Sequence, residues 1–317
     1  MEGGFTRDMG REKRLLGVVG LILLFLCLLP LVASDYHVSV TLDLMMWIAL
    51  TASWIVLSGY PGYISLGHSA FFGLGAYLMA MTWTRIPFGF GVVLAGLLSA
   101  GFAFAIGFPF LRVRGPYFVI LTLGLTEFTK YLFINLEIKL GGTVGRILMM
   151  TPSLHILYYS ILVVSVIAVA TAYYIKNSRF GTALFSIKED EDAANAIGIN
   201  TSLYKWLAFG LSASFPGMVG SILALRRSYI DPYTVFNPIV SFQVIVMAFV
   251  GGLEDVEGAI VGAVILTLVS EALWARYPYT YMIILGVIMV FIVRFMPLGL
   301  VFPIKQRLAK KSKESHR

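Results

Sequence analysis

Apolar residues occur in long runs along this chain, and shorter polar or glycine- and proline-containing segments separate the runs. A helix needs about 20 apolar residues to cross the hydrocarbon core of a bilayer. Runs of this kind lie at about 15–33, 38–58, 64–84, 87–111, 115–134, 154–175, 203–225, 239–253, 259–276 and 278–296. The pattern predicts an all-α, polytopic integral membrane protein with about ten transmembrane helices, within a range of about eight to ten.

The composition agrees with a membrane protein. Hydrophobic residues make up 58% of the chain and charged residues 13%, whereas soluble domains carry about 25% charged residues. The single cysteine, Cys27, excludes an internal disulfide framework. Basic residues precede the run 15–33, and Val32-Ala33-Ser34 resembles a cleavage site. Because this run exceeds the about 7–15 residues of a signal-peptide core, an uncleaved first helix is favoured over a cleaved signal.

Lys and Arg residues gather at one side of the predicted spans, which gives the orientation. With the N-terminus in the cytoplasm, most of the 24 Lys and Arg residues fall on the inner side, although the pair Arg226-Arg227 falls outside. The formal charge of +7 therefore indicates topology and not nucleic-acid binding. We predict a cytoplasmic tail at 1–14, a transmembrane domain at 15–300 with a cytoplasmic segment at 176–202 inside it, and a basic cytoplasmic tail at 301–317.

No catalytic or cofactor-binding motif occurs in the sequence. The phosphate-binding pattern Gly-x-x-x-x-Gly-Lys-Ser/Thr, the Gly-x-Ser-x-Gly elbow and His/Cys clusters with metal-ligand spacing are all absent. The sequence therefore predicts no enzymatic activity, no metal site and no cofactor bound by this chain. A conduit is the remaining interpretation.

A glycine-rich stretch, GYPGYISLGHSAFFGLGAY at 59–77, is the first candidate for the wall of a conduit. Its early Gly and Pro residues should break the helix, and a broken backbone at membrane depth is tolerated where it is buried in protein or lines a cavity. Small residues recur every four positions in this stretch, at 65, 69 and 73, which suits plain helix packing equally well. The candidate translocation-path residues here are Gly59, Pro61, Gly62, Ser65 and His68.

Glu127 lies deep in the predicted span 115–134, about 18 Å from its start at the rise of an α-helix. An ionisable group near the bilayer centre costs at least about 2.5 kcal/mol and usually faces a cavity or a partner. Lys130 can pair with it on the same helix. Glu127 therefore has two alternative roles. It either forms a structural pair with Lys130, or it belongs, with Thr122, to the translocation path. Since proton relays use such carboxylates, Glu127 also keeps an ion-gradient-driven secondary transporter open.

The cytoplasmic segment KNSRFGTALFSIKEDEDAANAIGI at 176–199 is charged and amphipathic. Ala183, Ile187, Ala194 and Ile197 approximate one helical face, and the glycine after them can end the helix in a left-handed cap. A short amphipathic helix whose apolar face is not covered by its own chain can bind in a groove of a partner protein. Binding to the membrane surface is less favoured, because anionic headgroups would repel the acidic residues. The predicted docking residues are Ser186, Ile187, Lys188, Glu189, Asp190, Glu191, Ala193, Ala194, Ile197 and Gly198.

A second interruption, GGLEDVEG at 251–258, carries three carboxylates on the predicted cytoplasmic side. A tight turn between two helices is favoured over a gate. The spacing of Gly258 and Gly262 predicts a close helix-packing face.

Five ordered blocks of the sequence resemble the landmarks of one transporter family. They are GYPGYISLGHSAFFGLGAY, RVRGPYFVILTLGLTEF, GGTVG, SRFGTALFSIKEDEDAANAIGIN and VGGLEDVEGAIVGA. From about residue 38 to 300 the chain resembles the permeases of branched-chain amino acid ABC importers, of the Liv type that pairs with a shorter homologous subunit. The resemblance implies a permease subunit for Leu, Ile and Val in the plasma membrane of a bacterium or archaeon.

The resemblance also implies a set of partners. They are a second homologous permease subunit, two ABC ATPase subunits that hold ATP and Mg²⁺, an extracytoplasmic substrate-binding protein and the lipid bilayer, with no nucleic acid. Within the chain, 181–200 resembles the region that docks on the ATPase. Tyr63 and Pro61 depart from the residues usual in the family. Urea and short-chain amide permeases are closely similar, so these substrates stay open as alternatives.

Overall fold

The computed structural model describes residue 17, residues 19–149 and 151–277, and the positions 280, 283, 284, 286, 287 and 290. The predicted tails at 1–14 and 301–317 lie outside the described residues, as does most of the predicted span 278–296. The orientation of the two termini therefore stays a prediction.

The described chain is built from α-helices with one short pair of strands. The elements are α2 (Asp35–Ser58), α3 (His68–Thr82), α4 (Phe88–Phe110), α5 (Pro116–Gly141), β1 (Arg146–Ile147), α6 (Leu154–Lys176), α7 (Arg179–Glu189), α8 (Glu191–Ala196), α9 (Thr201–Arg227), β2 (Tyr229–Ile230), α10 (Pro232–Val235), α11 (Pro238–Gly251) and α12 (Val256–Arg276). A shorter apolar helix, Val19–Val32, precedes them. The predicted all-α class is confirmed.

Within the described residues, seven helices are long and apolar enough to cross a membrane, counting α10 and α11 as one continuous span. They bear out a multi-pass membrane protein. The helix Val19–Val32 and α3, which has 15 residues, correspond to two further predicted spans but are shorter. The predicted count of about ten is therefore not confirmed, and its last member falls mostly outside the described residues.

Two predicted spans differ clearly from the helices observed. The run 64–84 is helical only from His68, because the chain from Gly59 to Gly67 forms no regular helix. The run 115–134 continues as α5 to Gly141, where Gly142 takes a left-handed conformation with φ 71° and ends the helix. A hydropathy window misses this extension because the last turns of α5 are polar.

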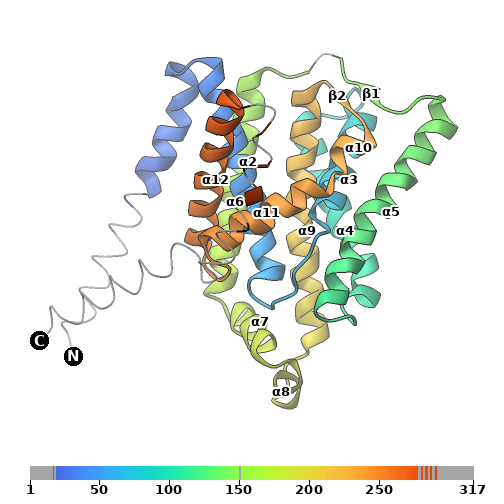
Figure 1. Ribbon diagram of the computed structural model, residues 1–317, viewed down its shortest axis with the longest axis vertical. Helices are drawn as coiled ribbons and strands as arrows, with labels where there is room; N and C mark the ends of the chain where they lie inside the picture. Colours follow the sequence, from blue (N-terminus) through green and yellow to red (C-terminus); the bar gives the residue numbers. More distant parts are fainter. Residues whose placement is uncertain are drawn as a thin grey trace, which may run out of the picture.

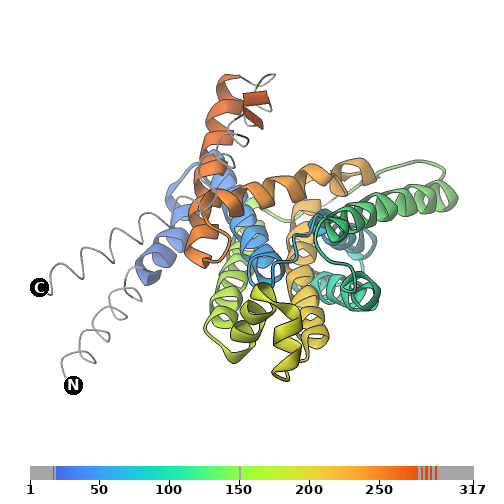
Figure 2. The ribbon, with the colours of Figure 1, turned by 60° about the horizontal axis from the view of Figure 1, so that its bottom comes forward.

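Helix α9 lies at the centre of the bundle and packs against α2, α3, α4 and α6 (Figure 1). Glycines allow its close approach to neighbouring backbones: a Cβ added at Gly75 of α3 would lie 1.9 Å from the carbonyl oxygen of Gly217 in α9. Helices α5 and α12 stand at opposite edges of the bundle, and turning the molecule shows the same separation (Figure 2). Large aromatic side chains, among them Trp54 and Phe209, are fully buried in the core.

The two ends of the bundle are built differently. At one end β1 pairs with β2 in antiparallel register, with Arg146 opposite Ile230. Near this end Arg226 of α9 forms an ion pair with Asp43 of α2 and donates to the hydroxyl of Ser39 at 2.6 Å. The cytoplasmic segment predicted at 176–202 forms α7 and α8 at the opposite end (Figure 1).

Candidate functional site

The segment predicted to be cytoplasmic forms two helices, α7 and α8, and not the single helix predicted. The side chain of Ser178 accepts from Gly181 N at 3.2 Å and caps the start of α7. Asp190 is extended, with φ −157°, and its carboxylate accepts from the backbone N–H groups of Asp192 and Ala193 at the start of α8. Aspartate is one of the preferred N-cap residues. As the N-cap of α8, Asp190 divides the acidic run, so that Glu189 ends α7 and Glu191 begins α8. Gly198 has φ +90° and follows α8, so the predicted left-handed end is confirmed.

The apolar face of this segment is mostly covered by the chain itself, which corrects the expectation that its own chain leaves this face uncovered. Ala183, Ile187 and Ala194 are buried within the described structure. Ile197 alone of the four is 75% exposed. Of the predicted apolar face, Ile197 is therefore the one residue left exposed to a partner.

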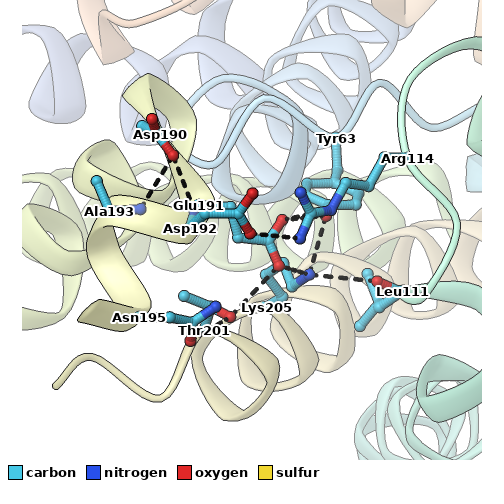
Figure 3. Close-up of polar contacts among 10 residues, drawn as sticks. All are labelled: Tyr63, Leu111, Arg114, Asp190, Glu191, Asp192, Ala193, Asn195, Thr201 and Lys205. Atoms are coloured by element: carbon cyan, nitrogen blue, oxygen red, sulfur yellow. Dashed lines mark hydrogen bonds and ion pairs between the residues drawn. The ribbon is translucent and has the colours of Figure 1, made fainter. Parts of the chain in front are cut away.

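Glu191, predicted as a docking residue, points into the protein and is held by several groups (Figure 3). Its carboxylate lies 2.5 Å from Lys205 Nζ in α9 and 3.2 Å from Arg114 Nε in the loop between α4 and α5. The hydroxyl of Tyr63 donates to the same carboxylate at 2.7 Å, and Thr201 donates at 3.3 Å. The side chains of Glu191 and Lys205 are only 10% and 4% exposed. We call these five residues the junction.

Lys205 is the most fully bonded cation of the junction. Besides Glu191, its ammonium donates to the hydroxyl of Tyr63 at 2.9 Å and to the carbonyl of Leu111 at 3.2 Å. The three donors of an ammonium are thus all used, which is what a buried charge requires. The junction joins α8, α9, the loop after α4 and the irregular segment after α2 at one point.

Burial opposes ionisation of Glu191, but hydrogen bonds from Lys205 and Tyr63 and the nearby positive charges outweigh it and lower the pKa of its carboxyl. A carboxyl whose pKa is lower in the folded than in the unfolded state stabilises the fold above its ordinary value of about 4.5. This stabilisation disappears as the pH falls from that value through the lower pKa of the folded state.

We expect the difference in melting temperature between the wild type and Glu191→Gln to become smaller as the pH is lowered. The wild type should melt at the higher temperature at pH 7, and the gap should shrink as the pH is lowered from about 5 to about 3. Thermal unfolding of the detergent-purified chain over this range measures it. Asp192→Asn, at a neighbouring carboxylate that is 84% exposed, is the control and should keep the wild-type pH dependence. A gap for Glu191→Gln that stays constant would contradict the linkage.

Helix α7 is tied to the turn between α11 and α12. Lys188 pairs with Glu254 at 2.6 Å, and Lys176 at the end of α6 pairs with Asp255. The predicted tight turn is confirmed, since α11 ends at Gly251 and α12 begins at Val256. The predicted close packing is confirmed as well, since a Cβ added at Gly262 would lie 1.9 Å from the carbonyl oxygen of Met247. The turn is thus connected by ion pairs to α7 and to the end of α6.

The predicted break after α2 is confirmed, and its residues are tightly packed. Gly62 has φ +80°, and an added Cβ at Gly59 would lie 2.1 Å from the carbonyl oxygen of Leu253 in the α11–α12 turn. Ser65 lies outside α3, so the predicted face of small residues does not begin there. Its carbonyl accepts from the indole of Trp54 at 2.9 Å instead. Gly59 and Gly62 therefore have structural roles at the C-terminal end of α2.

Two of the other predicted path residues, His68 and Thr122, are buried in the core. The hydroxyl of Thr122 accepts from Leu66 N at 3.0 Å, and Ser69 N donates to the hydroxyl of Ser241 in α11 at 2.9 Å. His68 is buried beside them, with Nε2 3.4 Å from the hydroxyl of Ser53. Its Nδ1 has no hydrogen-bond partner among the described residues.

Glu127 lies on a different face of α5 from Thr122. Thr122, Thr126 and Thr129 are buried, whereas the Glu127 side chain is 39% exposed and forms an ion pair with Lys130. The predicted intrahelical pair is confirmed. A role of Glu127 in the translocation path stays a prediction, and the structure does not bring it together with His68.

Sequence reasoning treated Arg114 only as a topology signal and gave no role to Tyr63 or Lys205. A lysine just inside an otherwise apolar run was the available signal, because such a charge needs a partner. Beside the junction, the structure has an open cavity of about 660 Å³ between the end of α4 and the start of α9. Both Arg112 and Phe108 line this cavity, and Cζ of Arg112 lies over the Phe108 ring, 4.3 Å from the ring centroid. Among the described residues no group of three or more His, Cys, Asp or Glu could hold a metal ion.

The sequence is similar to known permeases over most of its length. A family model described as "Branched-chain amino acid transport system / permease component" matches residues 37–293. The high-affinity branched-chain amino acid transport system permease protein LivM of Escherichia coli K12 is 28% identical over 96% of this chain and 79% of its own. LivM of Salmonella typhimurium is 28% identical over 89% and 74%, respectively.

A second group of relatives matches a smaller part. The probable branched-chain amino acid transport permease protein LivH of Methanocaldococcus jannaschii is 29% identical over 55% of this chain and 51% of its own. No solved structure matches the chain. The family model covers far more than half of the sequence, and the resemblance inferred from the five blocks is confirmed. The chain belongs to the family of permease components of branched-chain amino acid transport systems.

Proposed function

We propose that this chain is the membrane-spanning permease subunit of an ATP-driven importer, through which branched-chain amino acids enter the cell across the plasma membrane. The family match over residues 37–293, extended by similarity to LivM along most of both chains, carries the proposal. The helices that could span a membrane supply the conduit. The chain itself performs transport and not chemistry.

The partners we propose follow from the same family. A second homologous permease, related to LivH, would complete the membrane part, and two ATPase subunits would hold ATP and Mg²⁺. A substrate-binding protein on the outer side would deliver Leu, Ile or Val. The similarity of this chain to both LivM and LivH supports a pair of homologous permeases.

We propose that the ATPase docks on the exposed residues of α7 and α8. The predicted set needs revision, because Ile187, Ala194 and Glu191 face inward and Lys188 is paired with the neighbouring turn. The exposed candidates that remain, with their neighbours, are Glu189, Asp190, Asp192, Ala193, Asn195, Ile197 and Gly198. Their acidic character favours a basic groove on the partner.

Reconstitution into liposomes tests this function. The chain, the second permease, the ATPases and the binding protein from the same cell should take up labelled leucine only when ATP is enclosed with the ATPases. Unlabelled isoleucine and valine should compete, and urea and acetamide should not. Uptake of urea or a short-chain amide without leucine uptake would replace the proposed substrate by the alternative one.

The same liposomes separate the importer from a secondary transporter. An ionophore that collapses the proton gradient should leave leucine uptake unchanged, since ATP supplies the energy. Uptake by this chain alone, driven by a proton gradient and lost in Glu127→Gln, would contradict the importer. It would assign the proton step to Glu127.

A further inference from the structure

The irregular segment after α2, residues 59–67, is contacted at three points by the cytoplasmic end of the protein. The backbone of Leu253 in the α11–α12 turn lies against Gly59. The side chain of Lys188 in α7 lies beside Gly62, 3.3 Å from where a Cβ would be. The carboxylate of Glu191 in α8 accepts from the hydroxyl of Tyr63.

The other end of this segment is bonded to the middle of the bundle. Leu66 donates its N–H to the hydroxyl of Thr122 and accepts at its carbonyl from the hydroxyl of Thr126, at 3.0 and 3.2 Å. Both threonines belong to α5. The next residues begin α3, where Ser69 N donates to Ser241 of α11 at 2.9 Å. One short segment thus connects the cytoplasmic helices to three helices of the core.

The contact at Tyr63 differs from the other two, because the hydroxyl of this residue forms hydrogen bonds with side chains of two different helices. The Tyr63 hydroxyl donates to Glu191 of α8 at 2.7 Å and accepts from Lys205 of α9 at 2.9 Å. Its ring packs edge-on against Phe118 at the start of α5, with the centroids 5.2 Å apart. A displacement of α8 relative to α9 must therefore either break the bond to Tyr63 or move the segment that carries it.

We propose that Tyr63 is a positioning residue through which movement of α8 is transmitted to residues 59–67, and from there to α3, α5 and α11. The inference rests on the proposed function, in which partner ATPases dock on α7 and α8; movement of the ATPases would displace these helices. Within the junction, Tyr63 and Lys205 are buried, the Glu191 side chain is 10% exposed, and the three residues are bonded to one another. Packed contacts of this kind switch between discrete arrangements and do not deform continuously, which is what a transmitting contact requires. Tyr63 would act without touching the substrate.

The test is Tyr63→Phe, which removes one hydroxyl and keeps the ring against Phe118. In the reconstituted importer, the number of leucine molecules taken up per ATP hydrolysed should fall about fivefold or more, the usual size of an allosteric coupling. ATP hydrolysis and the assembled complex should persist. Tyr158→Phe is the matched control, because Tyr158 is also buried and its hydroxyl donates to one backbone carbonyl, that of Leu26. Its uptake per ATP should equal that of the wild type.

A second measurement needs no variant. Hydrogen exchange of backbone amides 64–69 in the wild-type complex should differ between the nucleotide-free state and the state with a non-hydrolysable ATP analogue, as should exchange in α8. Identical exchange at 64–69 while α8 changes would overturn the proposal, as would a wild-type uptake ratio in Tyr63→Phe. A wild-type complex that shows no ATP-driven uptake would overturn the proposed function, and the transmitting role with it.

Discussion

Lys205→Met is expected to cost about 3–5 kcal/mol of stability, the range found when one partner of a buried ion pair is removed. The substitution would leave the carboxylate of Glu191 buried without its closest cation. It would also remove the donors to Tyr63 and to the carbonyl of Leu111. The thermal unfolding midpoint of the detergent-purified chain, together with its yield from membranes, measures the loss.

Two further variants show whether the loss of stability comes from a charge left buried without its partner or from the removal of any lysine. Lys139→Met on α5 changes an exposed lysine and should stay within about 0.5 kcal/mol of the wild type. The double variant Glu191→Met with Lys205→Met should recover much of the stability, because a buried pair replaced as a whole leaves no uncompensated charge. A double variant that is less stable than Lys205→Met would contradict the account of the junction as a paired charge.

Much of the helical architecture could be predicted from the sequence, because the bilayer selects for length and apolarity. The runs behind α4 and α6 match the helices almost residue for residue. The break at Gly59 and the packing of Gly262 could be predicted as well, since both depend on local residue type. Helix ends that carry polar residues, such as the last turns of α5, could not be read from hydropathy.

The junction could not be predicted, because its residues are far apart in the sequence. Glu191 stands in an acidic run in which Glu189 is exposed, and nothing local distinguishes the two. What distinguishes them is the position of Tyr63, 128 residues away, and of Lys205 on the next helix. The single helix drawn from Ala183 to Ile197 was wrong for a related reason. The N-cap at Asp190 changes the direction of the chain between them.

The difference in burial between Glu127 and the neighbouring threonines of α5 also could not be predicted from the sequence. Depth along the predicted span could be estimated from the sequence, but the face of α5 that meets α3 could not. The structure places Thr122 against that inner face and leaves Glu127 partly exposed beside Lys130. The partly exposed carboxylate lies on an edge helix of this bundle, where a second permease subunit could reach it.

The second large effect is expected from Gly75→Ala, which should lower stability by about 1–3 kcal/mol or more. The new methyl group would lie 1.9 Å from the carbonyl oxygen and 2.7 Å from the Cα of Gly217. These are backbone atoms of the central helix, so relief requires α3 and α9 to separate. Small residues at such crossings let helices pack closely where no hydrophobic effect drives them together in lipid. The unfolding midpoint in detergent measures the loss.

Gly101→Ala on α4 is the matched control, because no atom lies within 4 Å of a Cβ added there. This substitution should leave stability unchanged or raise it, since alanine favours a helix over glycine by about 0.5–1 kcal/mol. Equal midpoints for the two variants would mean that the α3–α9 contact relaxes without cost. A low midpoint for Gly75→Ala alone would show that α3 and α9 cannot separate at this crossing without loss of stability.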